Sequence, residues 1–303
     1  MLYLSKLIEM NMKRLIVCII ATMTLTSLSA QTNPCETFFC ADFNQGKIFE
    51  FKDGKIVWEH RAPISNDLWV LKNGNRLFTT GHGVLEVTEQ KDTVFYYHSP
   101  ESEIFACQRL KNGNTFVGEC TSGRLLEINK KGKIVKEVNI GPGDPYFMRN
   151  ARRLDNGNYL IAHYGGKRVA VYDKKGHIVW EAPIAGGAHS VACLKNGHIV
   201  VASTDKAQDP KITEFDKKGN IVWELSNADL EGNPMQFMSG FQYLPESDSF
   251  LLTNWKGHNM ASDVPLILWV SRDKKILGTM PAHERLVTVA SIFVQGSSTR
   301  YNH

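Results

Sequence analysis

Two short phrases alternate along most of this chain, and each combines a tight turn with a strand. The first has the form LKNGNRLF, and its copies start at Leu71, Leu110, Leu154, Leu194 and, in degenerate form, Leu244, at intervals of 39, 44, 40 and 50 residues. The second has the form KKGHIVWE, as at residues 174–181, and falls between copies of the first. Glycine supplies the positive φ that a tight hairpin turn requires, so both phrases predict hairpins. A recurrence of about forty residues restricts the chain to a repeat fold.

Each repeat predicts four antiparallel strands, which we call a to d in chain order. In the third repeat they are EIFACQRL, NTFVGECT, GRLLEINK and KIVKEVNI, all within residues 103–140. Four-stranded units at this spacing are typical of a β-propeller, whose radial closure leaves few exposed edges. Six d strands can be counted, at Val57, Val94, Val135, Val179, Val222 and Leu277. The sequence therefore predicts an all-β, six-bladed propeller.

The first repeat lacks its a strand. It begins with a b-like run, ETFFCADF at residues 36–43, whereas an unassigned a-like run, VTVASIFVQ, stands at residues 287–295. We predict that this late strand completes the first blade and closes the ring. The tryptophans of the KIVWE phrases, Trp58, Trp180 and Trp223, are expected to pack between blades.

The N-terminal thirty residues have the pattern of a secretory signal. From Met12 the chain has two basic residues, an apolar run shorter than the roughly 20 residues that a membrane span needs, and Ser-Leu-Ser-Ala before Gln31. We predict a signal peptide over residues 1–30, with Met12 as the true start, and a single propeller domain over residues 31–303. The protein is then periplasmic or secreted, with no membrane span in the mature chain.

Charge and cysteine content exclude several other classes. The net charge is +4, and the 35 basic residues are scattered among 31 acidic ones, which argues against nucleic acid as a partner. The cysteines show no zinc-type spacing, so we predict no metal. Cys35 and Cys40 are close enough in sequence for a disulfide, a pairing that the sequence leaves open.

The candidate site lies at one end of the predicted propeller. The a-b and c-d turns share one end and are short and interchangeable, whereas the b-c and d-a connections at the other end, here called the loop end, vary in length and hold most of the histidines. Five residues before the anchoring leucine of each a strand stand Asn66, Phe105, Arg149, His189 and Ser239, with Asp67 and Asn150 next to them. The ends of b strands carry Asp42, Thr80, Glu119, His163, Ser203 and Thr253. Polar residues that differ from blade to blade predict a site at the mouth of the axial channel.

From these positions we select a set of candidate ligand-binding residues. They are Asn66, Asp67, Glu119, Tyr146, Arg149, His163, His189 and Trp255. The planar fork of Arg149 suits a carboxylate or sulfate, although an ion pair with Asp67 or Asp144 is the alternative. Tyr146 and Trp255 offer stacking surfaces, although they serve equally to hold their loops in place.

The repeat phrases carry a family resemblance. GKIVWE resembles the repeat of PQQ-like quinoprotein propellers, and GAHSVACLKNGHIV at residues 187–200 resembles phrases of arylsulfotransferase-type propellers. The second resemblance implies that His189 accepts a sulfuryl group while Arg149 and His163 bind its oxygens. Quinone enzymes of the first type hold a metal beside the quinone, a site that we cannot place here, and we predict no cofactor.

The sequence favours two functions over two others, which are metal binding by His82, His163, His189 or His258 with Asp42 or Glu119, and a protein-interaction platform. One of the favoured two is a binding module for a small polar or anionic ligand, with a carbohydrate-derived ligand as one option, held in the channel. The other is an enzyme with a histidine at the channel mouth. In that case His189 or His163 is the catalytic residue, either for sulfuryl transfer or, with Glu119 or Tyr146 as the acid, for a lyase or hydrolase reaction.

Overall fold

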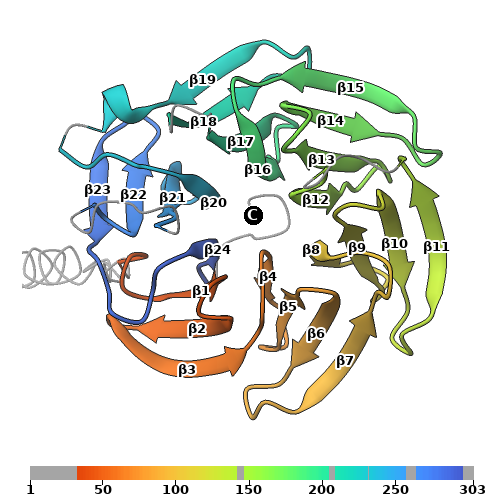
Figure 1. Cartoon of the computed structure of the whole chain (residues 1–303). Coiled ribbons are helices and arrows are strands. Elements are labelled where there is room, and N and C mark those ends of the chain that lie inside the picture. The colour runs from red at the N-terminus through yellow and green to blue at the C-terminus, as the bar shows by residue number, and fades with distance from the viewer. Residues whose placement is uncertain (1–32, 142–146, 205–208, 231, 257–263, 296–303) are drawn as a thin grey trace, which may run out of the picture. The chain divides into compact units, whose positions relative to one another are not determined.

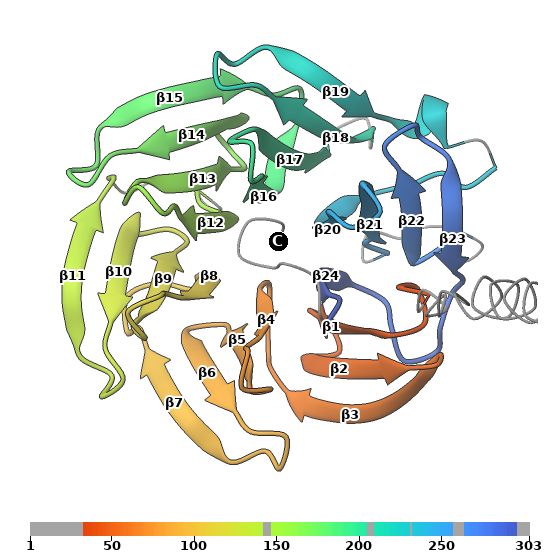
Figure 2. The same cartoon turned by 180° about the vertical axis from the view of Figure 1, so that it is seen from behind.

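The computed structural model describes residues 33–141, 147–204, 209–230, 232–256 and 264–295. The predicted signal peptide, Asp144 and Tyr146 lie outside these residues. From Pro34 onward the chain forms one compact unit of six four-stranded antiparallel sheets, arranged as blades around a central axis (Figures 1 and 2). This confirms the prediction of a six-bladed propeller. Within the described residues, no helix has the length and apolarity needed to cross a membrane.

The blades follow one another along the chain, and blade 1 also takes in the last described strand. Blade 1 contains β24 (Val289–Phe293), β1 (Phe38–Asp42), β2 (Lys47–Lys52) and β3 (Lys55–Arg61). Blade 2 contains β4 (Leu68–Val70), β5 (Arg76–Thr80), β6 (Gly83–Val87) and β7 (Thr93–His98). Blade 3 contains β8 (Ile104–Arg109), β9 (Thr115–Glu119), β10 (Arg124–Ile128) and β11 (Ile134–Asn139).

The remaining three blades have the same order, with the first strand innermost. Blade 4 contains β12 (Asn150–Arg153), β13 (Tyr159–His163), β14 (Arg168–Tyr172) and β15 (Ile178–Pro183). Blade 5 contains β16 (Gly187–Cys193), β17 (Ile199–Thr204), β18 (Pro210–Phe215) and β19 (Ile221–Leu225). Blade 6 contains β20 (Met238–Leu244), β21 (Ser249–Asn254), β22 (Ile267–Ser271) and β23 (Ile276–Met280), preceded by a short 3₁₀ turn, η1 (Asn227–Asp229).

The ring closes through β24, as the sequence predicted. This strand pairs antiparallel with β1, with Phe293 opposite Phe39 and Ile292 opposite Cys40. Asp42, at the end of β1, reinforces the closure. One of its carboxylate oxygens accepts the backbone N–H groups of Val287 (2.7 Å) and Thr288 (2.9 Å), and the other accepts the Thr288 hydroxyl (2.6 Å).

The two repeated phrases have the structural roles that their composition indicates. In the first phrase, Leu71 donates its backbone N–H to Asn75 and Gly74 donates to Leu71, which closes a turn with Gly74 at a φ of 84°. In the second, the indole N–H of Trp58 donates to the Glu89 carbonyl in the next blade (2.8 Å), and Trp223 donates to Arg272 in the same way (2.8 Å). These tryptophans pack between blades, as expected.

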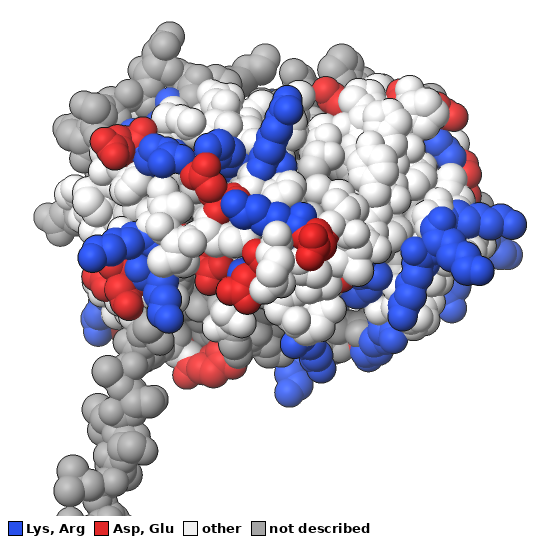
Figure 3. Space-filling model, turned by 90° about the horizontal axis from the view of Figure 1, so that it is seen from below, with Lys and Arg blue, Asp and Glu red and all other residues white. Residues whose placement is uncertain are grey.

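Apolar side chains fill the spaces between neighbouring sheets. One cluster, for example, joins Val200 and Ile212 of blade 5 to Phe241 and Leu268 of blade 6. On the rim seen in Figure 3, basic and acidic side chains both occur, often side by side. Glu59, for instance, accepts hydrogen bonds from both Lys47 and Arg285, each at 2.6 Å.

In the described part of the chain, no disulfide joins Cys35 to Cys40. Both side chains are buried. Burial raises the pKa of Cys35 to about 12, and it raises the pKa of Cys40 well above its ordinary value.

Candidate functional site

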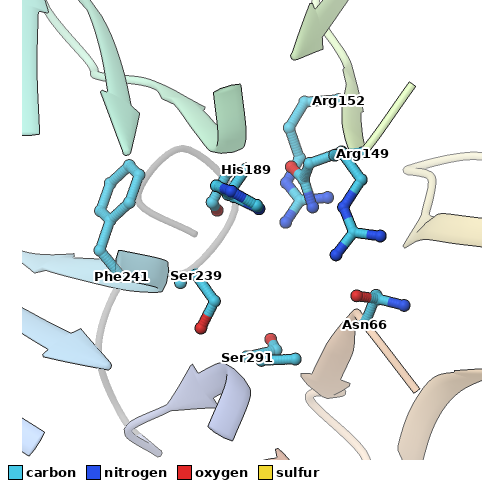
Figure 4. A pocket seen from close by; sticks show the side chains of 11 residues that line it. Asn66, Arg149, Arg152, His189, Ser239, Phe241 and Ser291 are labelled. Atoms are coloured by element: carbon cyan, nitrogen blue, oxygen red, sulfur yellow. The ribbon is translucent and has the colours of Figure 1, made fainter. Parts of the chain in front are cut away.

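A cavity that is open to solvent lies on the propeller axis, between the innermost strands, and its empty space, counted together with the adjoining solvent, is about 330 Å³ (Figure 4). Its described lining comes from blades 1, 2, 4, 5 and 6, and it consists of Asn66, Arg149, Asn150, Arg152, His189, Ser190, Ser239, Gly240, Phe241, Ala290 and Ser291. Three of the predicted ligand-binding residues, Asn66, Arg149 and His189, therefore meet in one space. Two arginines and a histidine line the cavity, and none of the described lining residues is acidic.

Local irregularities in the innermost strands accompany the polar residues at this point. The pairing of β16 with β17 shifts register between Ala188 and Ser190, so that His189 is the extra residue of a β-bulge. Ser239 has the same place in β20, and Phe105 has it in β8. Bulges bend a strand and re-aim a side chain, and they are common next to functional sites. The position that varies from blade to blade in the sequence is thus the bulged position in three of the blades.

Arg149 is held against an aromatic face. Its guanidinium carbon lies 4.8 Å from the centre of the Phe105 ring, which is a favourable cation–π geometry, and Phe105 itself is buried. From there the guanidinium extends into the cavity toward Asn66 (Figure 4). The Asn66 amide donates to the Ile64 carbonyl (3.2 Å), which helps to hold that side chain at the opposite wall.

His189 lies between two aromatic rings. Its ring centre is 4.5 Å from that of Phe237 and 5.0 Å from that of Tyr164, both with edge-to-face geometry. The side chain is buried, with 6% of the residue exposed, but it faces the cavity (Figure 4). Packing on two sides fixes the orientation of the imidazole at the edge of the cavity.

Asp67 has a different position from the one that the sequence suggested. It is not part of the described cavity lining. Instead, its carboxylate accepts two hydrogen bonds from Arg152 (2.8 and 3.0 Å) and one from the backbone N–H of Cys107 (2.9 Å). Burial raises the pKa of the Asp67 carboxyl above its ordinary value, although the Arg152 guanidinium opposes this shift. Asp67 is thus paired with Arg152 of blade 4.

His163 and Glu119 also lie away from the described lining. The two ring nitrogens of His163 are hydrogen-bonded, Nδ1 to the Phe147 carbonyl (3.0 Å) and Nε2 to the Tyr172 hydroxyl (2.9 Å), in a fully buried position. Glu119 is equally buried, and it accepts from the Ser122 hydroxyl (2.6 Å) and lies 3.3 Å from Arg124. Both side chains are therefore held by partners in or beside their own blades.

Trp255 is also outside the described lining, but it packs near the cavity. Its ring centre is 6.3 Å from that of Phe237 and 5.2 Å from that of Phe43, and the residue is buried. Tyr146, the remaining predicted residue, falls outside the described part of the chain.

Sequence reasoning did not select five of the polar lining residues, and one of these, Ser239, stood at the aligned position without being chosen. Arg152, Ser190 and Ser291 lie further along their strands than the aligned position, and no periodic signal marks them. Asn150 was noted only as a neighbour of Arg149. It is 3% exposed, and among the described residues its amide oxygen has no hydrogen-bond partner. A buried acceptor of this kind on a cavity wall can accept a hydrogen bond from a donor group of a bound ligand.

Metal ligands are not grouped in the described part of the chain. There, no cluster of three or more His, Cys, Asp or Glu side chains has the arrangement that a metal ion needs. The described lining of the cavity supplies two guanidinium groups, one imidazole and several neutral hydrogen-bonding groups.

Comparison with solved structures shows the same fold in other proteins. A protein of unknown function from Bacteroides caccae is 22% identical, with a TM-score of 0.76, and the match covers 84% of this chain and 97% of that one. A catalytically inactive variant of virginiamycin B lyase from Staphylococcus aureus, solved with quinupristin, is 16% identical with a TM-score of 0.57, covering 84% and 87%. A streptogramin B lyase is 14% identical with a TM-score of 0.58, covering 84% and 86%.

Sequence comparison gives a more direct assignment. No curated protein matches the chain. A family model, PQQ_2, described as outer membrane protein assembly factor BamB, matches residues 47–258, which is more than half of the chain. This match confirms the resemblance to PQQ-like repeats that the GKIVWE phrases carry. The chain therefore belongs to the BamB-like PQQ_2 family of β-propeller proteins.

Proposed function

We propose that this protein is an exported β-propeller that binds a small anionic ligand in its axial cavity. The observation that carries the proposal is the placement of Arg149, which lies on the Phe105 ring and extends its guanidinium into a cavity with no acidic group in its described lining. A guanidinium fork binds a carboxylate, sulfate or phosphate through two parallel hydrogen bonds. Held on an aromatic ring, it loses little conformational freedom when the anion arrives.

The other cavity groups indicate that the ligand is more than a bare anion. The Asn150 amide oxygen needs a hydrogen-bond donor, which an ionised carboxylate or sulfate lacks. The Ser190 hydroxyl is a further neutral group on the same wall. We therefore expect a ligand with one acidic group and at least one hydroxyl or amide.

Export is part of the proposal and rests on two observations. Residues 1–30 have the three-part pattern of a secretory signal, and the family is described as an outer membrane protein assembly factor. Expression of the full chain in a bacterium with an outer membrane should yield a periplasmic or secreted product beginning at Gln31. Recovery of an uncleaved chain in the cytoplasm would contradict export.

Calorimetric titration of the mature protein tests the ligand-binding proposal. The probes are inorganic sulfate, methyl β-glucuronide and 4-nitrophenyl sulfate, compared for the native protein, Arg149→Gln, and the matched control Arg61→Gln, whose arginine is exposed on β3. We expect at least one probe to bind, with an affinity that falls about tenfold or more in Arg149→Gln and remains unchanged in Arg61→Gln. The proposal would be contradicted if none of the three probes bound, or if the two variants lost affinity equally.

A second function, an enzyme that uses His189, is favoured by one specific observation. Of the two predicted catalytic histidines, His189 lines the same cavity as Arg149 and His163 is not in the described lining, and an imidazole titrates near neutral pH. An enzyme of this kind should release 4-nitrophenolate from 4-nitrophenyl sulfate when a phenol is present as the sulfuryl acceptor. In that case His189→Gln should abolish turnover while leaving the affinity for the probe within about threefold.

A further inference from the structure

An aromatic surface continues from the cavity toward the loop end of the propeller. We call it the aromatic shelf, and it consists of Phe43, Tyr164, Phe237 and Trp255. Three of the rings form a connected series, with 5.2 Å between the centres of Phe43 and Trp255 and 6.3 Å between those of Trp255 and Phe237. Phe237 and Tyr164 both contact His189, which also lines the cavity. The shelf and the cavity are therefore contiguous at His189.

The shelf residues come from three blades but from one end of them. Tyr164 directly follows β13, Phe43 follows β1 and Trp255 follows β21, while Phe237 directly precedes β20. Trp255 is buried, whereas Phe43, Tyr164 and Phe237 are only partly buried and keep ring surface accessible to solvent. In the core between the blades, by contrast, the large phenylalanines are almost all fully buried.

A glycine makes room for one of these rings. A Cβ atom at Gly187, the first residue of β16, would lie 2.2 Å from the Tyr164 ring, which is closer than two atoms can approach. Only glycine therefore lets Tyr164 lie across the backbone of β16 and reach His189. The arrangement of the shelf depends on this close approach.

We infer that the ligand is a sugar acid, whose acidic group occupies the cavity at Arg149 while the apolar face of its pyranose ring stacks on Phe237 and Tyr164. This inference rests on the proposed function and gives its ligand a chemical class. A pyranose has a C–H face that suits an aromatic surface and hydroxyl groups around its edge. Those hydroxyls supply the donor that the Asn150 oxygen needs and partners for Ser190. A simple aromatic anion would satisfy Arg149 and the shelf but would leave the Asn150 acceptor buried without a donor.

Titration of shelf variants of the mature protein tests the inference. We expect methyl β-glucuronide to bind about tenfold or more tightly than inorganic sulfate, because only the former contacts the shelf and Asn150. Phe237→Ala should weaken methyl β-glucuronide about tenfold and change sulfate affinity less than twofold. Arg149→Gln should weaken both probes. Tyr96→Ala serves as the matched control, because Tyr96 is an aromatic residue exposed on β7.

Two further measurements keep the test independent of folding defects. Phe237→Leu keeps the apolar volume and removes only the ring, so it should reproduce the selective loss with an unchanged melting temperature. Addition of methyl β-glucuronide should change the fluorescence of Trp255, which packs against Phe237, and this change should disappear in Trp255→Phe.

The outcomes separate the inference from the function on which it rests. If sulfate binding depends on Arg149 but methyl β-glucuronide binding is unchanged in Phe237→Ala, the sugar-acid inference is wrong and the proposed function stands. Tighter binding of 4-nitrophenyl sulfate than of methyl β-glucuronide, with dependence on Phe237, also overturns the inference, because the shelf then serves an aromatic ligand. If none of the anionic probes binds, both the sugar-acid inference and the proposed function are wrong.

Discussion

The ion pair between Asp67 and Arg152 should be one of the most sensitive points of the fold. Both side chains are almost fully buried, with 1% and 4% of their surfaces exposed, and they share two hydrogen bonds. The Arg152 guanidinium also lies 5.0 Å from the centre of the Trp69 ring, and Trp69 donates to the Cys107 carbonyl (2.6 Å). Replacing Asp67 by Ala leaves the arginine charge buried and its two hydrogen bonds to the carboxylate unmade.

The size of the effect follows from this burial. Removing one partner of a buried ion pair costs about 3–5 kcal/mol of the free energy of unfolding. For a chain of this size, with a urea m-value of about 3 kcal/mol per molar, a loss of 4 kcal/mol lowers the midpoint by about 1.3 M. Arg152→Met should cost a similar amount, because it leaves the Asp67 carboxylate buried. The double variant should recover about 2 kcal/mol or more relative to the sum of the single variants.

Urea unfolding of the four proteins, followed by tryptophan fluorescence, measures this double-mutant cycle. Asp67→Asn serves as a milder change, since its amide oxygen can still accept the Cys107 N–H. Two results would refute the reasoning. One is a cost below about 1 kcal/mol for Asp67→Ala. The other is strict additivity of the two single variants, which would mean that the two charges do not stabilise each other.

Three further predictions concern other groups. His163→Ala should lower the free energy of unfolding by about 2–4 kcal/mol without changing probe affinity, because both ring nitrogens bond within the blade; a loss of affinity would place His163 in the site. Glu59 has a pKa below its ordinary 4.5, because Lys47 and then Arg285 donate to it, so its stabilisation is present above pH 4.5 and lost as the pH falls below that value. Because this ion pair is partly exposed, it should contribute at most about 1 kcal/mol to the free energy of unfolding measured with urea. Glu59→Gln should remove that pH-dependent contribution. Burial raises the pKa of Cys193 as well as those of the buried thiols, but Cys193 is only partly buried, so iodoacetamide should modify it first; mass spectrometry would detect any other order.

The fold was predictable because its signals are repeated and local. The Leu-Lys-Asn-Gly turn closes through Leu71, Asn75 and Gly74 alone, so each copy specifies its hairpin independently of the rest of the chain. Closure by β24 was predictable for a related reason. The first repeat lacked an inner strand and the late strand belonged to no repeat, so pairing the two was the one arrangement that completed every blade.

The site was only partly predictable, because side-chain direction near the axis is not a local property. Alignment of the inner strands placed Asn66, Arg149 and His189 correctly at the cavity mouth. The same alignment did not show that Asp67 turns toward Arg152, two blades further along the chain. The β-bulge that makes His189 an extra residue leaves no signature in the sequence. His163 looked equivalent to His189 because both are polar breaks in apolar strands, and only the positions of Phe147 and Tyr172 distinguish them.

The closure of blade 1 by β24 also constrains the order in which the protein folds. The hydrogen bond from the Thr288 N–H to Asp42 joins residues 246 positions apart, so it forms only after most of the chain has been synthesised. Until then the fully buried strand β1 has an unpaired edge that can pair with other chains. Contacts of such long range make folding slow. We therefore expect nascent chains to depend on chaperones for longer than their locally paired blades would require.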